Sequence, residues 1–181
     1  IVAVYNEPLI LKALENLGYD TKEARKFAND GCWEVQIPGE TYFCYVPFDA
    51  LQILLSKTLN LNGEYRTFDS FEDLYNCFIE NLRQDVNAIY ENVVMGRFRK
   101  TEKGYEYKEA VPCSVTSLFI KGCIEKASSY YEGGPIYTVV SPHIGGAPDV
   151  GNSLYAIKKL VFDDKIISFD ELMKTLKANW E

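Results

Sequence analysis

The chain lacks the basic clusters and the long apolar runs that mark nucleic-acid-binding and membrane-spanning proteins. Its 181 residues contain 19 lysines and arginines against 26 aspartates and glutamates, so the formal net charge is -7. This charge repels a phosphate backbone, and we therefore expect no nucleic-acid partner. No stretch of apolar side chains reaches the roughly 20 residues that a membrane-spanning helix needs, so we also expect no membrane partner.

Disulfide and metal-binding patterns are missing as well. The five cysteines are widely spaced, no two of them are separated by two residues, and His143 is the single histidine. An odd number of isolated cysteines argues against a disulfide framework, and a lone histidine makes neither a metal site nor a catalytic triad. Free thiols of this kind indicate a cytoplasmic protein. The first residues lack an initiator methionine and a signal peptide, as though the chain were cut from a longer one.

Apolar residues are abundant enough for one compact unit or a slice of a larger one, since they make up 47% of the chain. Their helical spacing predicts helices over residues 9–17, 23–28, 50–59, 70–93, 114–127, 152–162 and 168–180. Alternation predicts extended segments at 32–47 and 136–140, and a hairpin at 101–107. The apolar stripe along residues 71–93 is expected to lie in the core. Cys123 is expected to join the core from a helix face that it shares with Val115 and Phe119.

Residues 29–34 carry the pattern that is most suggestive of chemistry. The run Asn29-Asp30-Gly31-Cys32-Trp33-Glu34 places a thiol on a turn after a helix and a carboxylate two residues later. Positions i and i+2 of an extended chain face the same side, so we expect Cys32 and Glu34 to face one small ligand. A hydrogen-abstracting thiol and a general base would need this geometry. By spacing alone, an inert cysteine beside a solvated carboxylate is the more common arrangement.

Four sequence blocks occur in a fixed order along the chain. They are Gly31-Cys32-Trp33-Glu34 with Ile37-Pro38-Gly39-Glu40-Thr41, then Gly122-Cys123-Ile124-Glu125-Lys126, Gly133-Gly134-Pro135-Ile136-Tyr137, and residues 149–162 (DVGNSLYAIKKLVF). Together they resemble the corresponding blocks of glycyl radical enzymes of the pyruvate formate-lyase type. The resemblance covers essentially the whole chain, and residues 172–180 are also similar to a segment of that family.

The resemblance implies an α/β fold, in which the chain is a helix-rich fragment of a ten-stranded α/β barrel. It implies a single partial domain over residues 1–181, with the catalytic cysteine loop at 29–47. In this family a stable glycyl radical oxidises a cysteine on a central loop to a thiyl radical, and Cys32 matches that cysteine. Glu34 matches the general base of the dehydratase, decarboxylase and C–N or C–S lyase branches. Formate-forming members carry two adjacent cysteines, so Trp33 disfavours pyruvate cleavage.

Trp33, Tyr45 and Tyr137 are the residues that we expect to line the substrate pocket. Diol and glycerol dehydratases of the family have a Trp-His-Asp sequence where this chain has Cys44-Tyr45-Val46. Val46 cannot hydrogen-bond a hydroxyl group. We therefore expect a small organic substrate that is larger or more apolar than a simple diol.

The family motif that holds the radical glycine, R-V-x-G-[YF], does not occur in these 181 residues. We therefore expect the chain alone to be inactive and to hold no cofactor or metal. The resemblance implies a glycyl radical in a full-length protein of anaerobic metabolism, installed by a radical S-adenosylmethionine activating enzyme, and it is compatible with a homodimer. The alternative is a non-catalytic fold fragment, or a binding or assembly module of the same family, in which Cys32 is an ordinary thiol.

Overall fold

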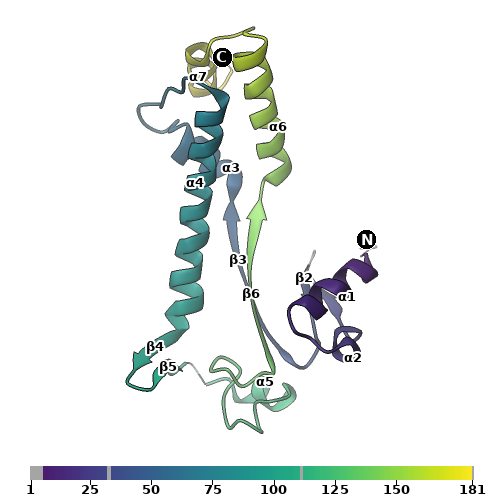
Figure 1. The fold of residues 1–181 in the computed structure, drawn as a ribbon. Helices are drawn as coiled ribbons and strands as arrows, with labels where there is room; N and C mark the ends of the chain where they lie inside the picture. Colours follow the sequence, from purple (N-terminus) through teal and green to yellow (C-terminus); the bar gives the residue numbers. More distant parts are fainter. Residues whose placement is uncertain (1–5, 32–33, 111, 181) are drawn as a thin grey trace. The chain divides into compact units, whose positions relative to one another are not determined.

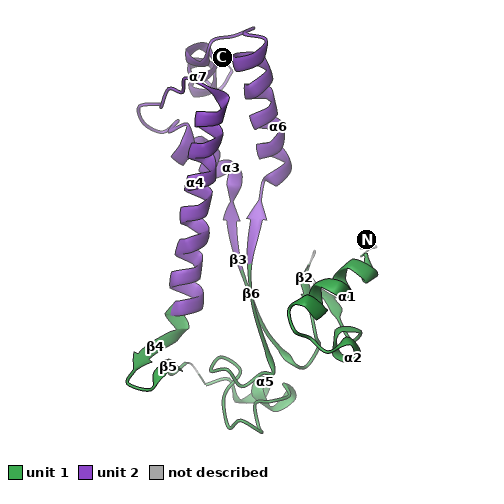
Figure 2. Cartoon of the chain, in the orientation of Figure 1, with its two compact units in different colours: residues 1–45, 96–141 green, residues 46–95, 142–181 purple. Residues whose placement is uncertain are grey.

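The computed structural model describes residues 6–31, 34–110 and 112–180 (Figure 1). The chain divides into two compact units, each made of two separate stretches (Figure 2). The first unit contains residues 1–45 and 96–141, and the second contains residues 46–95 and 142–181. The expectation of a single partial domain over residues 1–181 stays a prediction.

Two strands pass through both units. They are β3 (Thr41–Asp49) and β6 (Tyr137–Gly145), which form a two-stranded sheet, and their arrows point the same way in Figure 1. Of the extended segment predicted at 32–47, residues 32–33 lie outside the described residues, and the rest is confirmed by β2 (Glu34–Gln36) and β3, with a turn between them. The segment predicted at 136–140 is confirmed by β6, which continues further than the alternation indicated. With the helices described below, this pair gives the helix-rich α/β class that we expected.

The first unit holds short elements. They are α1 (Glu7–Asn16), α2 (Thr21–Ala24), β1 (Ala28–Asp30), β2 (Glu34–Gln36), β4 (Phe98–Thr101), β5 (Gly104–Tyr107) and α5 (Ser114–Phe119). Strands β4 and β5 pair antiparallel from Phe98↔Tyr107 to Thr101↔Gly104, which confirms the predicted hairpin. The helix predicted at 9–17 is also confirmed, and Asn6 caps it by accepting a hydrogen bond from the Leu9 amide.

The second unit is built from helices. Helix α3 (Ala50–Gln52) continues as a π-helix at Ile53–Thr58. Helix α4 (Phe71–Ile89) continues as a π-helix at Tyr90–Val94 and a 3₁₀ turn at Met95–Arg97. Helix α6 (Ala147–Ile157) continues as a π-helix at Lys158–Asp163, and the last helix is α7 (Phe169–Lys177). Two of them begin at the serines that the sequence indicated. Ser70 accepts a hydrogen bond from the Asp73 amide at 3.2 Å, and Ser168 accepts one from Glu171. No helix in the described part of the chain is long and apolar enough to cross a membrane.

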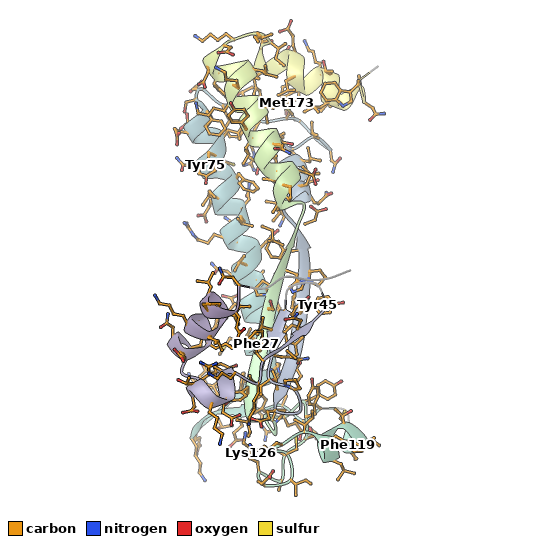
Figure 3. The ribbon with its side chains drawn as sticks, turned by 90° about the vertical axis from the view of Figure 1, so that its right-hand side faces the viewer. Phe27, Tyr45, Tyr75, Phe119, Lys126 and Met173 are labelled. Carbon is orange, nitrogen blue, oxygen red and sulfur yellow. The ribbon has the colours of Figure 1, made fainter. Side chains whose placement is uncertain are left out.

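The core of the second unit lies where α4, α6 and α7 meet the helix that follows β3. Leu54, Leu74 and Met173 are fully buried there, and Met173 is labelled in Figure 3. The apolar stripe of α4 is narrower than predicted, because Tyr75 and Tyr90 on this helical segment remain exposed. The side chains that carry the packing of α4 are Leu74 and Phe78.

The helix predicted at 23–28 is wrong. Helix α2 is a single turn that ends at Ala24, and Ala28–Asp30 is strand β1. Asp20 caps this turn by accepting a hydrogen bond from the Lys22 amide, and Glu23 pairs with Lys26. Residues 28–30 are extended because they pair antiparallel with β2, and this backbone pairing overrides the helical spacing of their side chains.

The helix predicted at 114–127 is also too long. Helix α5 ends at Phe119, and Cys123 is buried in a turn rather than on a helix face. Val115 and Phe119, at 73% and 79% exposed, do not join it in the core. At Gly122 the backbone adopts φ 97°, and a Cβ atom there would lie 2.6 Å from the Gly134 carbonyl oxygen. This close approach of two backbone segments excludes a continued helix.

Helix α6 starts earlier than residue 152, where the predicted helix begins. It begins at Ala147, after Gly146 in the left-handed conformation (φ 68°), with Pro148 in its first turn. Proline is favoured there because its missing N–H would have had no helical partner. The polar residues at 152–153 therefore lie inside the helix.

Candidate functional site

The segment in which we predicted the catalytic residues contains two paired strands of the first unit. Strands β1 and β2 pair antiparallel with Asp30 opposite Glu34, and Gly31 directly follows β1. Gly31 has φ 59°, the left-handed conformation that glycine adopts readily. Cys32 and Trp33 lie outside the described residues, so the expectation that Cys32 occupies a turn facing a cavity stays a prediction.

The Glu34 carboxylate lies back toward the end of β1. A Cβ atom built on Gly31 would lie 2.8 Å from Glu34 Oε2 and 3.0 Å from Oε1. The Glu34 side chain is half-buried, and Glu34 is the first residue of β2. The structure therefore places this carboxylate against Gly31, the residue that precedes Cys32 in the sequence. Whether the two side chains share one side stays a prediction.

The turn at residues 37–41 fixes the direction in which the chain enters β3. Thr41 Oγ1 accepts a hydrogen bond from the Ile37 amide at 3.1 Å and donates one to the Ile37 carbonyl at 3.0 Å. The Glu40 amide also donates to the Ile37 carbonyl. Ile37 and Thr41 are buried, so these bonds are shielded from water. The β1–β2 pair and β3 are thereby joined by a rigid turn.

Glu40 ties this turn to two other segments of the first unit. Its side chain is buried (8% exposed), and its carboxylate lies 3.2 Å from Lys121 Nζ and 3.7 Å from Lys26 Nζ. Lys26 also pairs with Glu23 at 2.7 Å, and this hydrogen bond lowers the pKa of Glu23 and raises the pKa of Lys26. The Tyr137 amide donates to the Glu40 carbonyl at 3.0 Å, which fastens the start of β6 to the same turn.

Of the predicted pocket residues, Tyr137 is held by a partner that the sequence did not indicate. Its half-buried ring stacks on Tyr19, with ring centroids 4.4 Å apart and planes at 26°. Burial raises the pKa of Tyr19, and Tyr137 adds to the shift. Tyr45 on β3 is 58% exposed and is labelled in Figure 3. A shared substrate pocket of Trp33, Tyr45 and Tyr137 stays a prediction.

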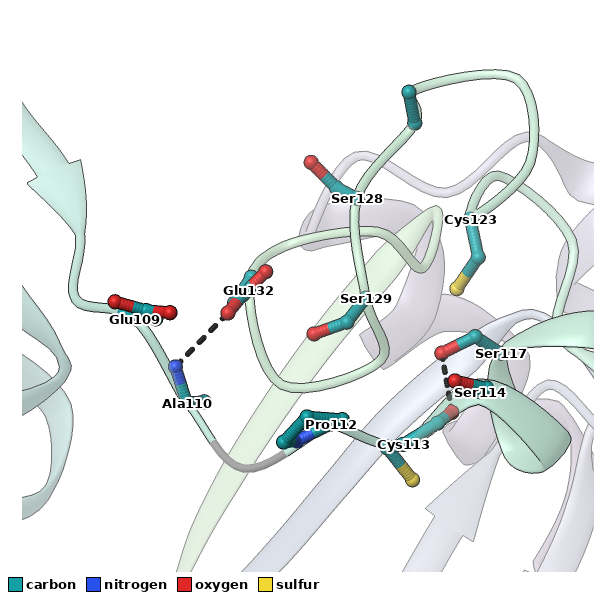
Figure 4. A pocket seen from close by; sticks show the side chains of 11 residues that line it. Glu109, Ala110, Pro112, Cys113, Ser114, Ser117, Cys123, Ser128, Ser129 and Glu132 are labelled. Carbon is teal, nitrogen blue, oxygen red and sulfur yellow. Dashed lines mark hydrogen bonds between the residues drawn. The ribbon is translucent and has the colours of Figure 1, made fainter.

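A hollow elsewhere in the first unit brings together small polar side chains (Figure 4). It has a volume of about 380 Å³. Glu132 accepts a hydrogen bond from the Ala110 amide at 2.9 Å, and Ser117 donates one to the Cys113 carbonyl at 2.7 Å. Cys123 in its wall is buried, and this burial raises the pKa of its thiol. Across residues 6–31, 34–110 and 112–180, no three histidine, cysteine, aspartate or glutamate side chains gather as metal ligands.

Comparison with known proteins places these features in a family context. A family profile described as pyruvate formate lyase-like matches residues 1–181. The trans-4-hydroxy-L-proline dehydratase of Clostridioides difficile is 28% identical over 99% of this chain and 23% of its own length. The (2S)-3-sulfopropanediol dehydratase of Klebsiella oxytoca is 23% identical over 98% of this chain and 22% of its own length.

A solved structure shows that the fold of this chain is also similar to that of such a protein. The structure described for 1,2-propanediol dehydration in Roseburia inulinivorans superposes with a TM-score of 0.75 at 29% identity, covering 99% of this chain and 23% of that one. This chain therefore spans about a quarter of the length of the relatives that it matches.

Proposed function

Because this chain belongs to the pyruvate formate lyase-like family of glycyl radical enzymes, we propose that it is the segment of a glycyl radical lyase that carries the catalytic cysteine, Cys32. The proposed reaction is dehydration, decarboxylation or cleavage of a C–N or C–S bond in a small organic substrate. The proposal includes a cytoplasmic full-length protein, which assembles as a homodimer, and a radical S-adenosylmethionine activating enzyme as its partner.

The observation that carries the proposal is the pairing of β1 with β2. The two strands bring the backbones of Asp30 and Glu34 opposite each other, on either side of Cys32 in the sequence, and the Glu34 carboxylate lies against Gly31. A proton acceptor is thus held against the residue that precedes Cys32 in the sequence. The buried turn at 37–41 supports the pair from its C-terminal side.

In the proposed reaction, the glycyl radical of the full-length protein supplies the oxidising equivalent that turns the Cys32 thiol into a thiyl radical. The Cys32 sulfur then takes a hydrogen atom from a substrate carbon, so that a C–H bond breaks and an S–H bond forms. In the dehydration and C–N or C–S cleavage reactions, Glu34 accepts the proton of the hydroxyl on that carbon, and the group on the neighbouring carbon leaves with its electron pair. The product radical takes the hydrogen atom back from Cys32, which restores the thiyl radical for the next step.

Trp33, Tyr45 and Tyr137 are proposed to enclose the substrate. The stacking of Tyr137 on Tyr19 and its backbone bond to Glu40 give the ring a defined place, which a pocket wall requires. Val46 next to Tyr45 offers no hydrogen bond to a hydroxyl group. This favours a substrate whose contacts with β3 are apolar.

The test uses the full-length protein that contains this chain, treated with an activating enzyme, S-adenosylmethionine and a reductant. Electron paramagnetic resonance should detect a glycyl radical in the wild type and in Cys32→Ser, whereas Cys32→Ser should have no turnover. An O–H bond is much harder to oxidise to a radical than an S–H bond. Cys44→Ser, which changes a half-buried cysteine on β3, is the matched control and should retain both radical and turnover. Turnover by Cys32→Ser would contradict the proposal.

A further inference from the structure

The guanidinium group of Arg97 lies among aromatic rings of the first unit. Its central carbon is 4.0 Å from the ring centre of Tyr42 and 5.2 Å from that of Tyr107. One Nη atom donates a hydrogen bond to the Tyr131 carbonyl at 3.2 Å. Stacking on ring faces orients a guanidinium plane and leaves its edge available for hydrogen bonds.

This arginine borders a cavity of about 600 Å³, whose wall also includes Tyr42, Tyr131, Lys108 and Cys113. The volume is in the range of small-molecule sites, and such sites combine apolar walls with a few polar groups. The Tyr131 ring, which is 42% exposed, provides flat apolar surface here, and two cationic side chains provide the polar groups.

The two cations are not neutralised within the described residues. Arg97 makes no ion pair there, and Lys108 donates to the Gly96 carbonyl at 2.7 Å but pairs with no carboxylate. Neighbouring Arg99, in contrast, pairs with Glu106 at 3.3 Å. Glu109 lines the same cavity and is the negative group that faces it. A guanidinium has five N–H groups, so most of those on Arg97 lack an acceptor in the described chain.

We propose that this cavity binds a small organic carboxylate with a flat apolar body. The carboxylate would accept hydrogen bonds from the edge of the Arg97 guanidinium, which matches it in planar, bidentate geometry. Its flat body would contact the exposed ring of Tyr131, and Lys108 would add a second positive charge. The site is separate from the proposed reaction, since it requires neither Cys32 nor Glu34.

Benzoate is the first probe, because it joins one carboxylate to one ring. Titrated into the 181-residue chain at low ionic strength, it should bind with a dissociation constant of about 1 mM, as expected for so small a ligand. Isothermal titration and the amide NMR shifts of residues around Arg97 measure this. Benzyl alcohol, which keeps the ring but has no charge, should bind about tenfold more weakly. Acetate, which keeps the charge but has no ring, should also bind more weakly.

Two arginine variants separate the site from general electrostatic attraction. Arg97→Gln should weaken benzoate binding about tenfold, whereas Arg99→Gln, which removes an equal charge two residues away, should leave it unchanged. Arg97→Lys keeps the charge but loses the bidentate edge, and it should give an intermediate affinity. Circular dichroism confirms that each variant is folded before it is titrated.

Three results would overturn the proposal. The first is no detectable binding at a benzoate concentration of about 10 mM, which is tenfold above the expected dissociation constant. The second is an equal loss of benzoate affinity in Arg97→Gln and Arg99→Gln. The third is an equal affinity of the unmodified chain for benzoate and benzyl alcohol. The comparison of ligands uses the unmodified chain, so it decides the question even if Arg97→Gln does not fold. None of these results depends on radical chemistry, so failure here and failure of the lyase proposal are distinguishable.

Discussion

The carboxylate of Glu34 occupies the space in which a side chain on Gly31 would begin. The position of a Cβ atom on Gly31 is 2.8 Å from one carboxylate oxygen and 3.1 Å from the carboxyl carbon. Glycine at this position therefore serves two purposes, since it also adopts a left-handed conformation (φ 59°). The residue before Cys32 and the proposed base are thus sterically coupled.

The first prediction tests this coupling through stability. Gly31→Ala should lower the melting temperature of the chain more than Gly18→Ala does. Both glycines have positive φ, and an alanine there costs about 1–2 kcal/mol, but the space around Gly18 is open. In a Glu34→Ala background, Gly31→Ala should lose its extra cost and resemble Gly18→Ala. Equal effects in the two backgrounds would mean that Glu34 does not occupy this space.

The second prediction compares two glycines without positive φ. A Cβ atom on Gly134 would lie 2.3 Å from the Ser128 carbonyl oxygen and 2.7 Å from Cys123 Sγ, whereas one on Gly151 would meet nothing within 4 Å. Gly134→Ala should destabilise the first unit by about 1–3 kcal/mol or more, through overpacking. Gly151→Ala, inside helix α6, should stabilise the chain by about 0.5–1 kcal/mol. Urea denaturation of the two variants measures both changes.

The helix boundaries that the sequence predicted well are those set by contacts within a few residues. Ser70 and Ser168 each bond to the amide three positions later, so the signal and the structure lie in the same short window. The boundaries that it predicted poorly depend on backbone pairing and packing between elements, which helical spacing does not report. Residues 28–30 have helical spacing but pair with β2, and Gly122 packs against Gly134. Local propensity is a weak preference that such tertiary contacts override.

The same distinction applies to the site. The motif around Cys32 indicated Glu34 because the two residues are close in sequence. The contacts of Tyr19 with Tyr137 and of Arg97 with Tyr42 join residues that are far apart along the chain, and no spacing rule relates them. A sequence indicates such residues as single aromatic or basic positions, and only the fold brings them together.

The third prediction concerns acid and the cap of helix α7. Hydrogen bonds from the Ser168 side chain and backbone lower the pKa of Glu171. A carboxylate whose folded pKa lies below its unfolded value, about 4.3, stabilises the fold above that value. This stabilisation is lost as the pH falls through the folded pKa. Glu171→Gln should therefore melt at a lower temperature than the wild type at pH 7, and the difference should disappear at strongly acidic pH.

Ser168→Ala is the control for this cap. It removes the serine hydroxyl at every pH and should cost about 0.5–2 kcal/mol at pH 7. In this background, Glu171→Gln should change the pH dependence less than it does in the wild type, because one of the hydrogen bonds that lower the pKa is gone. A difference between Glu171→Gln and wild type that persists unchanged at low pH would rule out the cap as its source.

The last prediction addresses the proposed proton transfer in the activated full-length protein. Glu34→Gln keeps the size and hydrogen-bonding capacity of the side chain but cannot accept a proton. Substrate binding and the glycyl radical signal should therefore be retained, while turnover falls by roughly 10²- to 10⁴-fold, the effect typical of losing a general base.

Glu40→Gln tests position rather than chemistry, since Glu40 contacts Lys26 and Lys121 and takes no part in the proposed reaction. The two variants should differ in their pH–rate profiles. If Glu34 is the base, Glu34→Gln should abolish the fall in rate at low pH, which is the acidic limb of the profile. Glu40→Gln should keep this acidic limb and have a lower rate. A Glu34→Gln enzyme with an unchanged acidic limb and near-normal turnover would assign the base to another residue.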